Sequence, residues 1–153
     1  MQKDQIYHNS LNNHMITIGF LKTLKDNLSP DDAYNFAKEA FKNYMVHRWS
    51  LILADTKPGS QERFDMFRKK HEEIAMNIEY RNVLESSPNL LRVVFFRCPF
   101  AEIMNEHGLK ELTTTFCLSD FSYTEEVLPG VTLTRNSVIA EGNDCCENIW
   151  IYN

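Results

Sequence analysis

Apolar residues in the first half of the chain recur at the three- and four-residue spacing that places them on one face of a helix. In the first such segment, residues 9–27, the apolar stripe consists of Leu11, Met15, Ile18, Leu21 and Leu24. A second segment starts after Ser29 and Pro30, residue types suited to an N-cap and a first helical position, and reaches about residue 54. A third begins after the helix-breaking run 57–60, continues from 61 to about 84 and ends at 86–89. We therefore predict that residues 1–87 form a helical scaffold.

The pattern changes after Pro88. Residues 90–96 form a continuous apolar run rich in β-branched and aromatic side chains, which is typical of a central strand. Residues 99–107 predict a short helix that Gly108 ends, and helical spacing resumes from 109 to about 120. The second half of the chain therefore begins as strand, helix, helix.

Two further strands complete the expected fold. After the turn at 129–130, apolar and polar residues alternate over 131–136, and residues 146–152 form the last strand. The turn at 142–143 joins these two strands, so a β-hairpin is expected. Because the sequence shows neither an internal repeat nor a linker long enough to divide it, residues 1–153 are expected to form a single domain. We predict an α+β fold in which N-terminal helices pack on a small, mainly antiparallel C-terminal sheet with one or two inserted helices.

Composition narrows the function classes. Hydrophobic residues at 43% and charged residues at 24% are ordinary for a soluble domain. The formal net charge is −5 and the basic residues do not cluster, so we expect no nucleic-acid partner. The sequence has no apolar run long enough to span a membrane and no apolar signal-peptide core near Met1, and four cysteines in such a chain indicate a reducing compartment. We expect a cytoplasmic protein, with a homodimer possible through apolar helix faces.

The cysteines are the first candidates for chemistry, and all of them fall in the last third of the chain: Cys98, Cys117, Cys145 and Cys146. A thiol reacts as the thiolate, so its pKa must be lowered by a cation or a helix N-terminus. Cys98 directly precedes the helix predicted at 99–107. Cys117 has Asp120 three residues later on the same helical face, and Cys146 opens the last strand. The alternative is that each thiol is a small buried apolar side chain.

Metal binding and charge pairing give further alternatives. Three cysteines with His107 or Asp120 are possible zinc ligands, but the local Cys-x-x-Cys and His-x-x-x-His pairs are missing, so no metal or cofactor is expected.

Arg135 lies on an alternating strand, on the face of Val131 and Leu133. A guanidinium on an apolar face needs an anionic partner. That partner is either a substrate carboxylate or an Asp or Glu across the sheet, and both possibilities stay open.

Taken in order, these residues resemble the L-2-amino-thiazoline-4-carboxylic acid hydrolase family. The matching pattern consists of Cys98-Pro99-Phe100, the segment Glu106 to Gly108, Cys117-Leu118-Ser119-Asp120, Arg135, and Gly142 followed four residues later by Cys146. It covers roughly the last third to two-fifths of the chain.

The resemblance implies an enzyme that opens a cyclic amidine ring, such as a 2-aminothiazoline carboxylate. On that basis Cys117 or Cys146 is the expected nucleophile, Asp120 binds the amidine and Arg135 binds the substrate carboxylate. The substrate-binding set also includes Cys98 and His107, which are candidates for proton transfer. Two rival functions remain: a small-molecule-binding or thiol-based sensor domain without turnover, and a redox- or metal-responsive protein using its cysteines.

Overall fold

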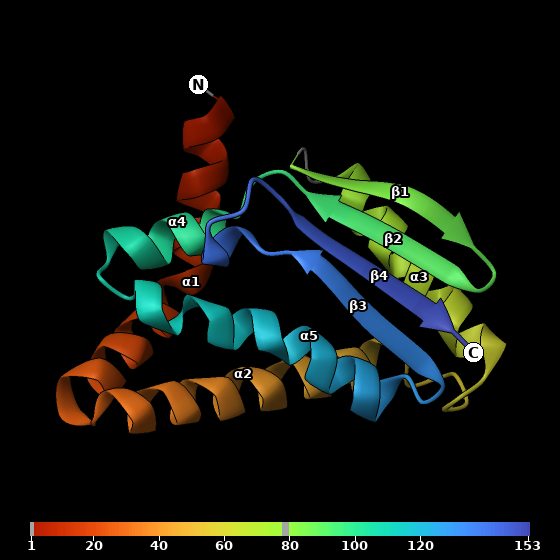
Figure 1. Cartoon of the computed structure of the whole chain (residues 1–153), viewed down its shortest axis with the longest axis horizontal. Coiled ribbons are helices and arrows are strands. Elements are labelled where there is room, and N and C mark those ends of the chain that lie inside the picture. The colour runs from red at the N-terminus through yellow and green to blue at the C-terminus, as the bar shows by residue number, and fades with distance from the viewer. Residues whose placement is uncertain (1, 78–79) are drawn as a thin grey trace.

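Helices cover one face of a four-stranded antiparallel sheet (Figure 1). The computed structural model describes residues 2–77 and 80–153. The elements in chain order are α1 (Gln2–Asn27), α2 (Pro30–Ile52), α3 (Gln61–Met76), β1 (Arg81–Ser87), β2 (Leu90–Phe95), α4 (Pro99–Glu106), η1 (Lys110–Leu112), α5 (Thr113–Val127), β3 (Val131–Ser137), η2 (Ile139–Glu141) and β4 (Cys146–Tyr152). The predicted α+β class, with mainly N-terminal helices and an antiparallel sheet, is confirmed.

Serine N-caps set two helix starts where the sequence predicts them. The Ser29 hydroxyl oxygen accepts the backbone N–H of Asp32 at 3.2 Å, and Pro30 occupies the first turn of α2. The Ser60 oxygen accepts the N–H of Arg63 at 3.2 Å at the start of α3. These bonds satisfy N–H groups that have no carbonyl partner within the helix.

The prediction for the third helix is wrong at its C-terminal end. The helix ends at Met76, and Arg81–Ser87 is strand β1, which pairs antiparallel with β2 from Arg81–Phe95 to Ser87–Leu90. Pro88 and Asn89 therefore form a hairpin turn, where a helix end was expected. Pairing with the apolar strand β2 overrides the helical spacing of the sequence. Residues 78 and 79 lie outside the described residues.

The first helix is longer than expected. It begins at Gln2, whereas the sequence pattern predicts a first helical segment over residues 9–27. The added turns are tied to the rest of the fold, because the Tyr7 hydroxyl donates a hydrogen bond to the Glu106 carboxylate at the end of α4. This tertiary contact joins residues that lie far apart in the sequence.

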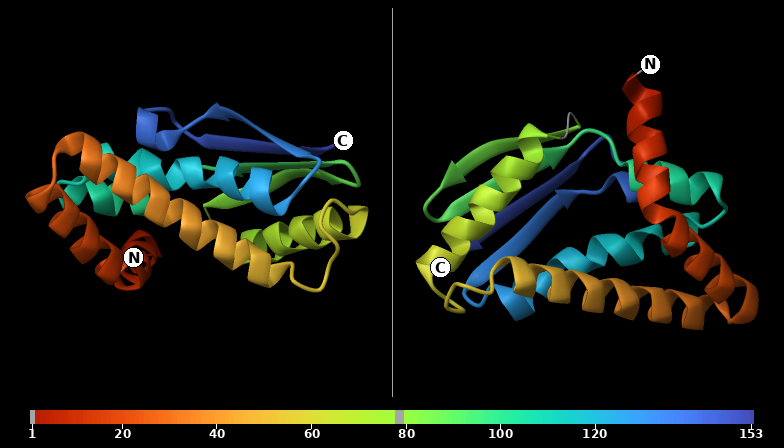
Figure 2. Two further views of the ribbon diagram at one scale, coloured as in Figure 1. Left: turned by 90° about the horizontal axis from the view of Figure 1, so that it is seen from below. Right: turned by 180° about the vertical axis from the view of Figure 1, so that it is seen from behind.

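The sheet has the order β1-β2-β4-β3, so β2 is central, as predicted, and the predicted β3–β4 hairpin pairs antiparallel. One core fills the space between the sheet and helices α2, α3 and α5, and Figure 2 shows these helices beneath the sheet. Its largest fully buried side chains include Trp150, Tyr123, Phe64 and Phe67. A second core joins α1 to α4 around Leu21, Ile103 and Met104. In the described part of the chain, none of the helices is both long and apolar enough to cross a bilayer.

Candidate functional site

A small cavity lies where α5 meets strand β3. Its volume is about 300 Å³. The residues that line it are Tyr34, Thr114, Cys117, Leu118, Phe121, Arg135, Val138 and Glu141. Figure 1 shows α5 running alongside β3, which explains how Cys117 and Arg135 reach one cavity although 18 residues separate them in the sequence. The structure thus brings together two of the residues predicted from the sequence.

Arg135 is the centre of the site. Its Nε donates to Asn148 Oδ1 at 2.7 Å, its Nη1 to the Cys117 carbonyl at 2.8 Å, and its Nη2 to the Asp120 carboxylate. The guanidinium carbon also lies 5.1 Å from the centre of the Phe121 ring, within the range of a cation–π contact. Only 8% of the side chain is exposed. The partner of Arg135 in the protein is an acidic side chain, which was one of the two alternatives, but it comes from helix α5 and not from across the sheet.

The Asp120 carboxylate is bonded to the Arg135 guanidinium. Its Oδ2 accepts from Arg135 and, at 3.2 Å, from Asn148 Nδ2. Burial raises the pKa of Asp120, and the nearby Arg135 and Asn148 only partly offset that effect. The carboxylate does not line the small cavity, so its position is that of a group that orients Arg135.

Burial keeps the Cys98 and Cys117 thiols protonated at neutral pH. Burial raises the pKa of Cys117 to about 12 and that of Cys98 to about 11. Cys98 does cap α4, as its place before Pro99 predicts, and its sulfur accepts the Ala101 N–H at 3.3 Å. That hydrogen bond lowers the pKa by less than burial raises it. The helix N-terminus therefore does not by itself supply a thiolate.

The third predicted thiol lies in the same region. Cys146 accepts the Ile139 N–H at 3.1 Å, and burial raises its pKa. Cys98 and Cys146 are both close enough to Cys117 to raise its pKa, so the three thiols share one neighbourhood. His107 lies elsewhere: it follows α4 at the end opposite Cys98, with its backbone N–H bonded to the Ile103 carbonyl. The eight-residue helix places these two residues on the order of 12 Å apart.

Sequence reasoning missed three residues of the site. Asn148 is 3% exposed and links Arg135 to Asp120, and the sequence marks it only as a polar residue just before the apolar part of the last strand. Glu141 is the carboxylate that lines the small cavity, just before the turn at Gly142. Tyr34 comes from α2, where the sequence gives no sign of chemistry. Across the described residues, no three His, Cys, Asp or Glu side chains are grouped so as to hold a metal ion.

Comparison with known proteins places the chain in a family. No curated protein matches the sequence. Among solved structures, the chain is similar to a crystal structure of trafficking protein particle complex subunit 3 from Naegleria fowleri covalently bound to palmitic acid. The identity is 18%, the match covers 94% of this chain and 96% of that chain, and the TM-score is 0.49, a similarity from which we draw no conclusion. The profile of the L-2-amino-thiazoline-4-carboxylic acid hydrolase family matches residues 9–150, which is nearly the whole chain. The protein therefore belongs to the L-2-amino-thiazoline-4-carboxylic acid hydrolase family.

Proposed function

We propose that this protein opens the ring of a small cyclic amidine that carries a carboxylate, in the cavity lined by Cys117 and Arg135. The family name supplies the substrate class. The observation that carries the proposal is the Arg135 network: one guanidinium bonds the backbone of Cys117 and the carboxylate of Asp120, and both Arg135 and Cys117 line the cavity. A volume of about 300 Å³ lies at the lower end of small-molecule sites and suits a single ring.

Arg135 is the proposed anchor for the substrate carboxylate. A guanidinium has five N–H groups, and the bonds to Asn148, Cys117 and Asp120 use one on each nitrogen. One N–H on each terminal nitrogen therefore remains for a carboxylate, which pairs well with two parallel donors. Asp120 and Asn148 fix the plane of the guanidinium, so that it is preorganised before the substrate arrives.

Glu141 is the proposed partner of the amidinium. It lines the cavity, whereas Asp120, the residue expected for this role from the sequence, bonds Arg135 through Oδ2. A carboxylate beside a protonated amidine holds the cation and increases the electrophilic character of its central carbon. The substrate would thus have an anionic end at Arg135 and a cationic end at Glu141, and this arrangement fixes its orientation.

Cys117 is the proposed nucleophile. Its thiol passes a proton to the Glu141 carboxylate, which lines the same cavity, and the sulfur adds to the amidinium carbon to form a tetrahedral adduct. The ring heteroatom then leaves with the bonding electron pair and takes that proton back from Glu141, so that the opened substrate remains attached to sulfur. Water attacks the same carbon, the carbon–sulfur bond breaks, and the thiol is regenerated. The net reaction adds one water and releases a carbamoyl product.

Formation of the thiolate depends on the substrate in this proposal. A thiol with a pKa of about 12 is almost entirely protonated at neutral pH. An amidinium placed beside the sulfur favours the thiolate, because an opposite charge at close range lowers the pKa of an acid. Cys117 would therefore be unreactive in the free protein and become a nucleophile only in the complex.

The test is steady-state hydrolysis of L-2-amino-thiazoline-4-carboxylate by purified protein. Cys117→Ala should abolish turnover, Arg135→Lys should mainly raise KM, and Glu141→Gln should lower kcat/KM. Cys145→Ala is the matched control, because Cys145 is a neighbouring thiol outside the small cavity. Normal turnover by Cys117→Ala, or equal losses in Cys117→Ala and Cys145→Ala, would rule out the assignment.

One observation favours a second candidate function. The raised pKa values of Cys98, Cys117 and Cys146 are those of buried structural thiols, and they suit a cavity that binds a small molecule without turnover. In that case the amidine carboxylate would bind and be recovered unchanged, and Cys117→Ala would bind it as well as the unmodified protein does. Calorimetry combined with product analysis separates the two functions.

A further inference from the structure

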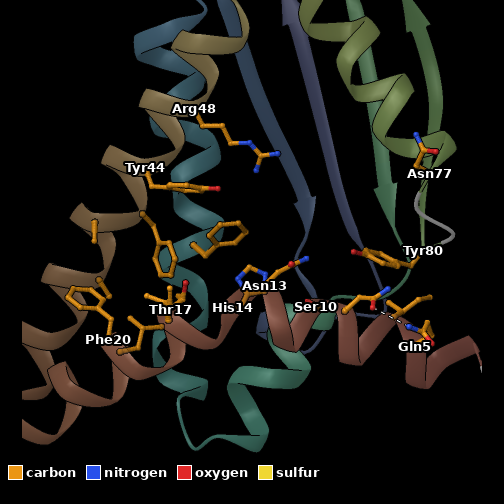
Figure 3. Close-up of a pocket in the computed structure, with 18 residues that line it drawn as sticks. Gln5, Ser10, Asn13, His14, Thr17, Phe20, Tyr44, Arg48, Asn77 and Tyr80 are labelled. Carbon is orange, nitrogen blue, oxygen red and sulfur yellow. Dashed lines mark hydrogen bonds between the residues drawn. The ribbon is translucent and has the colours of Figure 1, made fainter.

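A second and larger cavity lies between α1 and α2, and Tyr80, just before β1, also lines it. Its volume is about 1040 Å³, and α1 and α2 supply most of its wall (Figure 3). Phe116 of α5 also lines it, while the next residue, Cys117, lines the small cavity. The two cavities therefore adjoin the same helix, and nothing in the proposed hydrolysis uses the larger one.

The charge that the described residues bring to the wall of the large cavity is positive. Among the 18 described residues that line it, Arg48 is the one with a permanent charge, and none is Asp or Glu. Arg48 is exposed, extends from α2 towards the sheet in Figure 3, and has no hydrogen bond or ion pair within the described part of the chain. A guanidinium in this position can pair with a carboxylate through two parallel hydrogen bonds.

A second guanidinium, that of Arg81, lies near Arg48. Arg81 is 7% exposed and donates to the Nδ1 of buried His71. Arg48 is close enough to lower the pKa of both His71 and Arg81, although burial is the larger cause in each. In the described structure, the buried atoms Arg81 Nε and His71 Nε2 have no hydrogen-bond partner. This end of the cavity therefore favours an anion.

The rest of the wall is suited to an aromatic ring. Phe20, Phe41, Tyr44 and Phe116 line the cavity, and the Phe41 and Phe116 rings meet edge to face with centroids 5.2 Å apart. Phe20 is 47% exposed to solvent and Tyr44 is 56% exposed. A flat apolar ligand would cover these side chains and add ring contacts to the burial of apolar surface.

We propose that the large cavity binds a small aromatic carboxylate, with the carboxylate paired to Arg48 and the ring between Phe20, Phe41 and Tyr44. This site is independent of the proposed hydrolase activity, because its ligand contacts neither Cys117 nor Arg135. Its failure and the failure of the proposed function are therefore distinguishable by measuring binding without turnover.

The experiment compares two probes of equal shape, naphthalene-2-carboxylate and the uncharged naphthalene-2-carboxamide, by calorimetric titration of the full chain. The carboxylate should bind at least about tenfold more tightly than the carboxamide, since a charge-assisted pair is stronger than a neutral hydrogen bond. Arg48→Gln should remove that preference. Lys38→Gln is the matched control, because it removes an exposed cation from the same helix outside the cavity.

Two more variants locate the site. Ala40→Trp fills the cavity from α2 and should abolish binding of both probes, whereas Cys117→Ala should bind them normally. Equal affinities for the carboxylate and the carboxamide, full binding by Arg48→Gln or Ala40→Trp, or no binding of either probe would overturn the proposal. A loss of binding in Lys38→Gln equal to that in Arg48→Gln would also overturn it, since the effect would then be one of net charge.

Discussion

The Arg135 network makes a strong prediction about stability. Arg135→Met keeps the length and apolar stem of the side chain but removes the three hydrogen bonds to Asn148, Cys117 and Asp120. The Asp120 carboxylate then stays in the protein without its cation. Breaking a buried pair in this way destabilises a fold by about 3–5 kcal/mol. For a chain of this size, each kcal/mol lowers Tm by about 2–4 °C.

The matched control lies on the surface of α3. Lys70 pairs with Glu73, and 43% and 50% of these two side chains are exposed, against 8% and 23% for Arg135 and Asp120. An exposed pair contributes about 0–1 kcal/mol, so Lys70→Met should change stability little. Urea unfolding followed by circular dichroism gives both free energies. If Arg135→Met and Lys70→Met differ by less than about 1 kcal/mol, the reasoning is refuted.

A double variant separates charge from packing. Adding Asp120→Asn to Arg135→Met removes the unpaired carboxylate and should restore part of the lost stability, because the desolvation of a charge is the main cause of the loss. If the double variant is instead less stable than Arg135→Met by the full effect of Asp120→Asn alone, the two side chains are not coupled, and the network described above does not hold Arg135.

Three further predictions follow from burial and capping. The rate of alkylation of Cys117 by iodoacetamide should rise about tenfold per pH unit from about pH 7 to about pH 10, because the pKa of this thiol is about 12. Mass spectrometry measures the alkylated fraction, and a rate that levels off near neutral pH would contradict the prediction. Burial, with Arg81 and Arg48 nearby, lowers the pKa of His71 well below its usual value, so the unfolded state binds a proton first. Stability should therefore fall by up to about 1.4 kcal/mol per unit as pH drops below about 6.5, and His71→Phe should flatten that slope in acid unfolding curves. Ser29→Ala removes the N-cap of α2 and should lower the free energy of unfolding by about 1 kcal/mol. Ser50→Ala changes an exposed serine within the same helix, and a similar loss of stability in that variant would show that the cap is not the cause.

Most elements, but not strand β1, follow from local sequence rules, and so they were predictable. Ser29-Pro30 and Ser60 mark helix starts through side-chain bonds to nearby N–H groups. The dense apolar run at 90–96 predicts a central strand, and Leu90–Phe95 is one. Strand Arg81–Ser87 was not predicted, since its pairing with β2 is a tertiary effect and its own sequence also fits a helix.

The candidate site was predictable only in part. The sequence pattern singles out Cys117, Asp120 and Arg135, and these residues do meet. It does not indicate that Arg135 bonds Asp120 within the protein, because that pairing depends on how α5 crosses β3. Tyr34 and Glu141 carry no local signal either, since a lone tyrosine or glutamate on a helix is usually a solvated or boundary residue.

Trapping the covalent intermediate tests the central claim most directly. Acid quenching of the protein during turnover of L-2-amino-thiazoline-4-carboxylate, followed by peptide mass spectrometry, should show the Cys117 peptide heavier by the mass of one whole substrate, because ring opening retains every substrate atom. The Cys145 and Cys146 thiols should carry no adduct. Turnover with an adduct on another residue, or with Cys117 unmodified at every quench time while Cys117→Ala remains active, would contradict the account.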